Sequence, residues 1–214
     1  MEFALFMSAF VAIAGFFFWL DARATKKRKA AWTLVAETMG LKFDGQRITG
    51  RFEGVDLSVQ IVVRGSGKNR QVYTVFVFAL TNLPRHLWIA AEGFLSKVTK
   101  LLGSQDVQLG LPELDPKLMV KGKDEDEVRA WAQHSQVTNS LKQLVRPAGG
   151  AWQIEADELR FEKSSAIADA QHVEAVIRQF VSIAAGLSSK SSEVVARNTA
   201  EADDAVEEFE ENLW

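Results

Sequence analysis

The segment VDLSVQIVVRGSGKNRQVYTVFVFAL, residues 55–80, decides the fold class, because it predicts two antiparallel strands joined by a turn. Over residues 55–63, apolar and polar side chains alternate, which is typical of a strand with one buried face. Over residues 72–80 both faces are apolar, so we expect this second strand to be central and covered on both sides. The glycines between the two runs supply the turn.

Further elements flank this pair of strands. Before it, a helical pattern over 30–39 ends at Gly40, where a helix cap glycine is expected, and a strand follows at 48–52. After it, the patterns predict strands at 87–91, 118–121, 152–155 and 159–162, and helices at 94–102, 124–145 and 169–187. Because most strands follow one another through short turns, we predict an α+β domain over 30–187, in which two long helices pack on a mainly antiparallel sheet.

An apolar run, FALFMSAFVAIAGFFFWL at residues 3–20, precedes this domain. As a helix it spans roughly 27 Å, close to the hydrocarbon thickness of about 30 Å. Its flanks fit a membrane surface, with an aromatic ring at the end of the run and a basic cluster beyond it: Trp19, then Lys26, Lys27, Arg28 and Lys29. We therefore expect residues 1–29 to form a transmembrane helix with the N-terminus outside and the basic cluster on cytoplasmic lipid. This helix can continue into the 30–39 pattern as a stalk.

Three other interpretations of the apolar run are weaker. A cleaved signal peptide needs positive charge before the run, and only Met1 and Glu2 precede it. A buried core helix is rarely apolar on all sides over this length. The basic cluster alone resembles a nucleic-acid patch, but beside an apolar run such clusters usually set membrane topology. The formal net charge of −3 also disfavours nucleic acid as a partner.

The C-terminal segment, residues 188–214, carries eight acidic and two basic side chains after a serine-rich break. This composition is typical of a solvated tail. Apolar residues nevertheless recur in it at helical spacing and end in Phe209, Leu213 and Trp214. The alternative is therefore an amphipathic helix that docks into a basic groove, on a membrane or cytosolic partner or on the cationic loop of this chain.

That cationic loop is the tip of the predicted hairpin, where Arg64, Lys68 and Arg70 could contact an anion. It is not a phosphate loop, because the first glycine, the hydroxyl after the lysine and the following helix are all missing. Four acids at 124–127 suggest a metal site, but capping at the start of a helix explains them.

The remaining residue types give no catalytic motif. His86, His134 and His172 lack a partner at metal-ligand spacing, and we interpret the tryptophans of the domain, Trp88, Trp131 and Trp152, as core. Cysteine is absent, which removes disulfides, thiolate metal sites and cysteine nucleophiles. The sequence thus predicts no catalytic, cofactor-binding or metal-binding residue and favours a binding protein over an enzyme.

Three segments, together with the apolar run, carry a resemblance: WTLVAETMGLKFDG at 32–45, ITGRFEGVDLSVQI at 48–61 and LPELDPKLMVKGKDEDEVRAW at 111–131. They resemble an uncharacterised bacterial family of single-span, membrane-anchored proteins with a cytosolic α+β domain. The resemblance implies a bacterial inner membrane and no particular activity. We therefore expect a single-pass inner-membrane protein whose cytoplasmic domain binds or scaffolds a partner. The alternatives are an enzyme with an unrecognised active site and a domain that binds anionic lipid headgroups.

Overall fold

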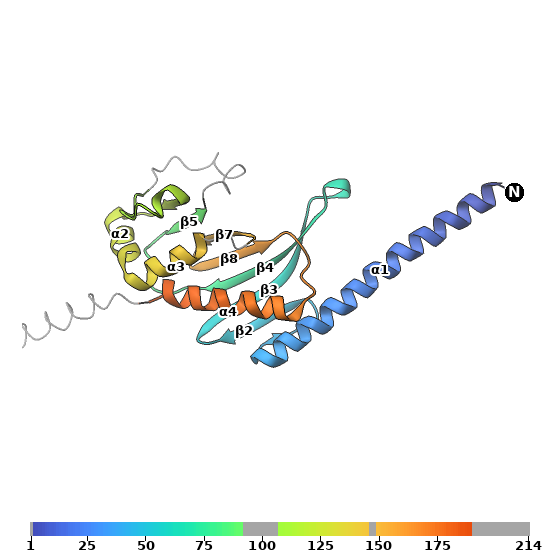
Figure 1. Ribbon diagram of the computed structural model, residues 1–214, viewed down its shortest axis with the longest axis horizontal. Helices are drawn as coiled ribbons and strands as arrows, with labels where there is room; N and C mark the ends of the chain where they lie inside the picture. Colours follow the sequence, from blue (N-terminus) through green and yellow to red (C-terminus); the bar gives the residue numbers. More distant parts are fainter. Residues whose placement is uncertain (1, 92–106, 146–148, 190–214) are drawn as a thin grey trace, which may run out of the picture. The chain divides into compact units, whose positions relative to one another are not determined.

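The computed structural model describes residues 2–91, 107–145 and 149–189 (Figure 1). It contains one eight-stranded sheet in the order β1-β2-β3-β4-β8-β7-β5-β6. The strands are β1 (Lys42–Phe43), β2 (Arg47–Phe52), β3 (Val55–Arg64), β4 (Gln71–Ala79), β5 (Trp88–Ala91), β6 (Leu118–Lys121), β7 (Ala151–Glu155) and β8 (Glu158–Lys163). The α-helices in this part of the chain are α1 (Glu2–Met39), α2 (Glu125–Gln133), α3 (Ser135–Val145) and α4 (Ala170–Leu187). The α+β class and the antiparallel sheet are confirmed.

The chain forms two compact units. The first comprises residues 1–79, 149–151 and 160–182, and the second comprises residues 80–148, 152–159 and 183–214.

The first unit is built on the predicted hairpin of β3 and β4, which pair antiparallel from Leu57 opposite Phe78 to Arg64 opposite Gln71. Both faces of β4 are covered at its middle, because the neighbouring residues Val75 and Phe76 are fully buried. The central, doubly covered strand is therefore confirmed. Figure 1 shows α4 lying along one face of these strands. The contact includes Phe180, whose ring centroid lies 5.7 Å from that of Phe78 and 4.4 Å from that of Phe161.

Helix α1 ends inside this unit as predicted. Trp32, Val35, Ala36 and Met39 are buried. Gly40 has φ +67°, and the amide of Leu41 donates to the carbonyl of Ala36 at 2.8 Å, which is the Schellman geometry of a helix C-terminus. The Trp32 indole donates to the carbonyl of Ile167 at 3.0 Å. The helix thus runs unbroken from the apolar run into the core.

The second unit contains β5, paired with β6 on one side and β7 on the other, together with α2 and α3. The predicted single helix over 124–145 is wrong. Helix α2 ends at Gln133 and His134 is extended, with φ −62° and ψ 131°. Val128 and Val137 are both fully buried, although about 2.5 turns would separate them in one helix and would place them on opposite sides. The break resets the helical phase so that both side chains reach the core.

Helix and turn signals elsewhere behave as expected. Asp124 caps α2 by accepting hydrogen bonds from the amides of Asp126 and Glu127, and Asp169 accepts from the amide of His172 at the start of α4. Between β7 and β8, Ala156 and Asp157 both have positive φ, as a two-residue hairpin turn requires. Strand β1 has no counterpart in the prediction, and the expected helix at 94–102 lies outside the described residues.

For most of the predicted membrane span, residues 3–20, the structure describes the backbone but not the side chains. Helix α1 includes its backbone, but of the side chains in 3–20 only that of Trp19 is described. Where side chains are described, no helix is both long and apolar enough to cross a membrane.

Candidate functional site

A hollow of about 730 Å³ opens in the second unit. Three chain segments line it, at residues 83–88, 121–123 and 155–157. The first segment leads into β5, the second follows β6 and the third follows β7, so the pairing of β5 with both neighbours brings them together. This size is within the range of about 300–1,000 Å³ for pockets that hold small organic ligands.

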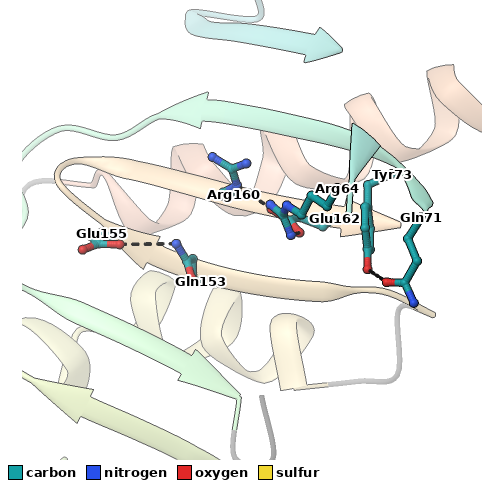
Figure 2. Close-up of polar contacts among 7 residues, drawn as sticks. All are labelled: Arg64, Gln71, Tyr73, Gln153, Glu155, Arg160 and Glu162. Carbon is teal, nitrogen blue, oxygen red and sulfur yellow. Dashed lines mark hydrogen bonds and ion pairs between the residues drawn. The ribbon is translucent and has the colours of Figure 1, made fainter. Parts of the chain in front are cut away.

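Positive charge lies on two of these segments. Arg85 and Lys123 are exposed, and Lys121 is half-buried. The exposed His86 imidazole lies next to Arg85 in the chain. The acids Glu155 and Asp157 both lie on the third segment, and Glu155 accepts a hydrogen bond from Gln153 at 3.3 Å (Figure 2). The cations therefore lie on segments separate from the two acids.

Trp88 supplies the aromatic surface of the hollow. In the sheet it stands directly opposite Lys121 on one side and Glu155 on the other, so the three side chains share a face. Trp131 and Trp152 are buried, which confirms them as core. Trp88 is half-buried and lines the hollow, so the interpretation of all three tryptophans as core is wrong for this one.

The backbone around the hollow adopts uncommon conformations. His86, Ala156 and Asp157 have φ of +57°, +50° and +61° and line it, and Asn82, with φ +58°, immediately precedes it. The turn between β7 and β8 explains Ala156 and Asp157. His86 is the third residue of a β-turn over residues 84–87, in which the Leu87 amide donates to the Pro84 carbonyl at 3.3 Å, and this position takes positive φ in several turn types. Tight turns therefore account for these conformations beside the hollow.

A second polar cluster lies in the first unit, around Glu162 on β8 (Figure 2). Arg64 donates from both terminal nitrogens to the two carboxylate oxygens, each at 2.7 Å, and Nε of Arg160 donates to Oε1 at 2.7 Å. The Arg64 guanidinium also lies 5.0 Å from the ring centroid of Tyr73, whose hydroxyl donates to Gln71. Burial alone would raise the pKa of Glu162, but the hydrogen bonds from Arg64 and Arg160 outweigh it and hold the pKa below its usual value.

This cluster changes the interpretation of the cationic hairpin tip. Arg64 is bound to Glu162, and that hydrogen-bonded pairing raises the pKa of Arg64. Lys68 and Arg70 lie exposed in or beside the short 3-10 turn Gly67–Asn69. Of the three residues predicted to contact an anion, the structure leaves these two away from any acid within its described part.

The other predicted site residues lie as follows. On α1, Lys26, Lys27 and Lys29 are exposed and Arg28 is half-exposed. Trp19 is 52% exposed, with the Arg23 guanidinium 5.3 Å from its ring centroid. The predicted docking residues Phe209, Leu213 and Trp214 lie outside the described residues.

The histidines sit apart from one another. His172 lies 3.0 Å from the Lys163 ammonium, and His134 contacts Ser189. His86 lines the hollow, which the sequence did not indicate. In the described part of the chain, no three histidine or carboxylate side chains gather closely enough to hold a metal ion.

Chemically, the hollow combines an aromatic ring, aliphatic side chains and cationic donors. The lining also includes the acids Glu155 and Asp157 against the three cations Arg85, Lys121 and Lys123, so the excess charge is positive and favours an acidic, partly apolar group. No protein-family model, curated protein or solved structure matches this chain.

Proposed function

We propose that the protein is a single-pass membrane-anchored binding module, held by its N-terminus in the inner membrane with its folded part on the cytoplasmic face. The observation that carries the proposal is the continuity of α1. This helix runs from Glu2 to Met39 in one piece, so it joins the apolar run to the folded core with no loop between them.

The two ends of α1 have different surroundings. At its C-terminal end, Trp32 is 1% exposed and its indole is hydrogen-bonded to Ile167, so this end belongs to the core of the first unit. Between the core and the apolar run, residues 22–30 are exposed or half-exposed and include the basic cluster. A short charged stretch between an apolar helix and a folded domain is typical of a membrane anchor, because the charged side chains lie at the lipid headgroups.

The basic cluster supports the orientation. Four consecutive cations beside an apolar run favour the cytoplasmic side, and each contributes about 1 kcal/mol when it contacts anionic lipid. Trp19 lies at the boundary between the run and this charged stretch, where the headgroup region favours an aromatic ring with a polar edge.

The test uses the absence of cysteine, because any introduced thiol is then the only one in the chain. Glu2→Cys and Ser66→Cys place a thiol at the N-terminus and at the exposed hairpin tip. In intact spheroplasts, a membrane-impermeant maleimide should label Glu2→Cys and should label Ser66→Cys only after lysis. Labelling of Ser66→Cys before lysis would refute the orientation.

Membrane attachment is tested separately. The full chain should remain in the membrane pellet after alkaline carbonate extraction, and a variant without residues 1–21 should be released. As a matched control, replacing Lys68 and Arg70 by glutamine removes exposed charge outside the anchor and should leave extraction unchanged. Release of the full chain by carbonate would exclude a spanning helix.

A further inference from the structure

We propose that the hollow of the second unit is the docking site of the acidic C-terminal segment of this same chain, residues 201–214. The hollow would then be occupied by a segment of the chain itself. This inference does not depend on the membrane anchor, since every group that carries it lies in the second unit.

The first argument is where the described chain ends. Ser188 is fixed beside the hollow, because its hydroxyl accepts a hydrogen bond from the Thr81 amide at 3.0 Å and its carbonyl accepts one from the Asn82 side chain at 2.8 Å. Thr81 and Asn82 directly precede Leu83, the first residue of the lining. The C-terminal segment therefore leaves the fold next to the hollow.

The second argument is reach. Residues 190–200 separate the last described residue from the proposed docking segment, and extended chain covers up to about 3.3–3.6 Å per residue. This gives roughly 36 Å, more than the hollow requires from a starting point at its rim. A tether of this kind keeps the segment at an effective concentration on the order of millimolar, so even a weak contact is populated.

The third argument is charge. The segment 190–214 carries eight acids and two bases. In the hollow, the Arg85 and Lys123 side chains are exposed and make no ion pair or side-chain hydrogen bond within the described part of the chain. With Lys121 the hollow has three cations against the two acids Glu155 and Asp157, so its excess charge is positive and association with an acidic segment is favoured.

The fourth argument is the apolar content of both partners. The lining includes Leu83, Pro84 and Leu87 beside the Trp88 ring. The segment ends with Phe209, Leu213 and Trp214, which are large apolar groups for an otherwise acidic chain end. Burying such a ring in an apolar site removes apolar surface from water, which adds to the charge attraction.

The experiment measures how fast a protease specific for acidic residues cleaves the tail in the purified full chain. One variant removes the hollow cations, Arg85→Ser with Lys123→Ser. A second removes the apolar groups of the tail, Phe209→Ser with Leu213→Ser and Trp214→Ser. The matched control, Lys68→Ser with Arg70→Ser, makes the same charge change at the hairpin tip, which lies outside the hollow.

We expect the first two variants to be cleaved at least 10-fold faster than the parent, and the control to be cleaved at the parental rate. Equal rates in the parent and the hollow variant would refute docking and leave a solvated tail. An equal increase in the control and the hollow variant would also refute the site, because it would show attraction to positive charge in general. Thermal melting of each variant checks that these exposed substitutions leave the fold intact.

Peptide binding gives a second measurement that does not depend on proteolysis. A fluorescent peptide of residues 201–214 should bind the full chain with the serine-substituted tail at least 10-fold more tightly than it binds the parent, since the parental tail competes for the hollow. Adding Arg85→Ser and Lys123→Ser to that chain should abolish the binding. Equal affinity for the parent and the tail variant would refute occupation by the tail.

Discussion

The substitution Thr74→Val tests the hydrogen bonds that fix the core of the first unit. Thr74 lies in the central strand β4 and is fully buried. Its hydroxyl donates to the carbonyl of Ser165 at 2.6 Å and accepts from the amide of Ile167 at 3.0 Å. Valine has nearly the same shape and suits a strand, so the change removes the two hydrogen bonds and little else.

The loss leaves a backbone amide and a backbone carbonyl without these partners. Each unsatisfied buried group costs about 1–3 kcal/mol, and the added methyl group recovers about 1 kcal/mol by burial. We therefore expect the free energy of unfolding to fall by about 1–5 kcal/mol, and the midpoint of thermal unfolding by roughly 2–20 °C. Thr49→Val in β2 is the matched control, because its half-buried hydroxyl makes no hydrogen bond within the described part of the chain.

The assay is urea and thermal denaturation of the purified full chain in mild detergent, followed by circular dichroism. The control should lie within about 0.5 kcal/mol of the parent. If Thr74→Val were as stable as Thr49→Val, these two hydrogen bonds would not stabilise the fold, and the reasoning would be refuted.

Three further predictions concern the rest of the fold. Because the pKa of Glu162 is lowered in the folded protein, the ionised carboxylate stabilises the fold above its usual pKa of 4.5, and this stabilisation is lost as the pH falls through the folded pKa. Glu162→Gln should remove that acid dependence and lower the free energy of unfolding by about 1–2 kcal/mol at pH 7. Urea denaturation across pH 3–7 measures both effects. Gly150→Ala would place a Cβ 2.6 Å from the carbonyl oxygen of Glu162 and 2.5 Å from the Phe161 ring, so thermal melting should show a loss of about 1–3 kcal/mol. A chain of residues 30–187 contains the buried end of α1 and all eight strands, and it should be soluble and unfold cooperatively; an aggregating product would contradict this.

Much of the fold could be predicted because its signals are local. The alternation in β3, the two apolar faces of β4 and the glycine after α1 each depend on neighbouring residues only. The last two match the structure, and the alternation matches it from Val55 to Val59, beyond which Ile61 is half-buried and Val63 is 46% exposed. The break at His134 could also have been found by following the helical phase, because Val128 and Val137 cannot share one face of a continuous helix. Apolar content alone suggests one helix there, and only the position of each apolar residue around the helix axis shows the break.

The hollow could not be predicted, because its three segments meet only through pairing between distant strands. β5 pairs with β7, although α2 and α3 lie between the two strands in the sequence, and nothing local in either strand specifies that partner. The charged residues beside these strands then look like ordinary loop residues. Glu162 was missed for the same reason, since Arg64 reaches it from a different hairpin.

Ile167 connects the proposed anchor to the central strand. Its carbonyl accepts the hydrogen bond from the Trp32 indole at the end of α1, and its amide donates to the Thr74 hydroxyl in β4. Both hydrogen bonds are buried. Shifting α1 against β4 would leave buried polar groups without a hydrogen-bond partner, at a cost of about 1–3 kcal/mol for each group. The backbone of Ile167 thus joins α1 to the central strand, in addition to the buried side chains at the end of the helix. If the apolar run spans the bilayer, the first unit follows the orientation of that helix and does not swing on a linker.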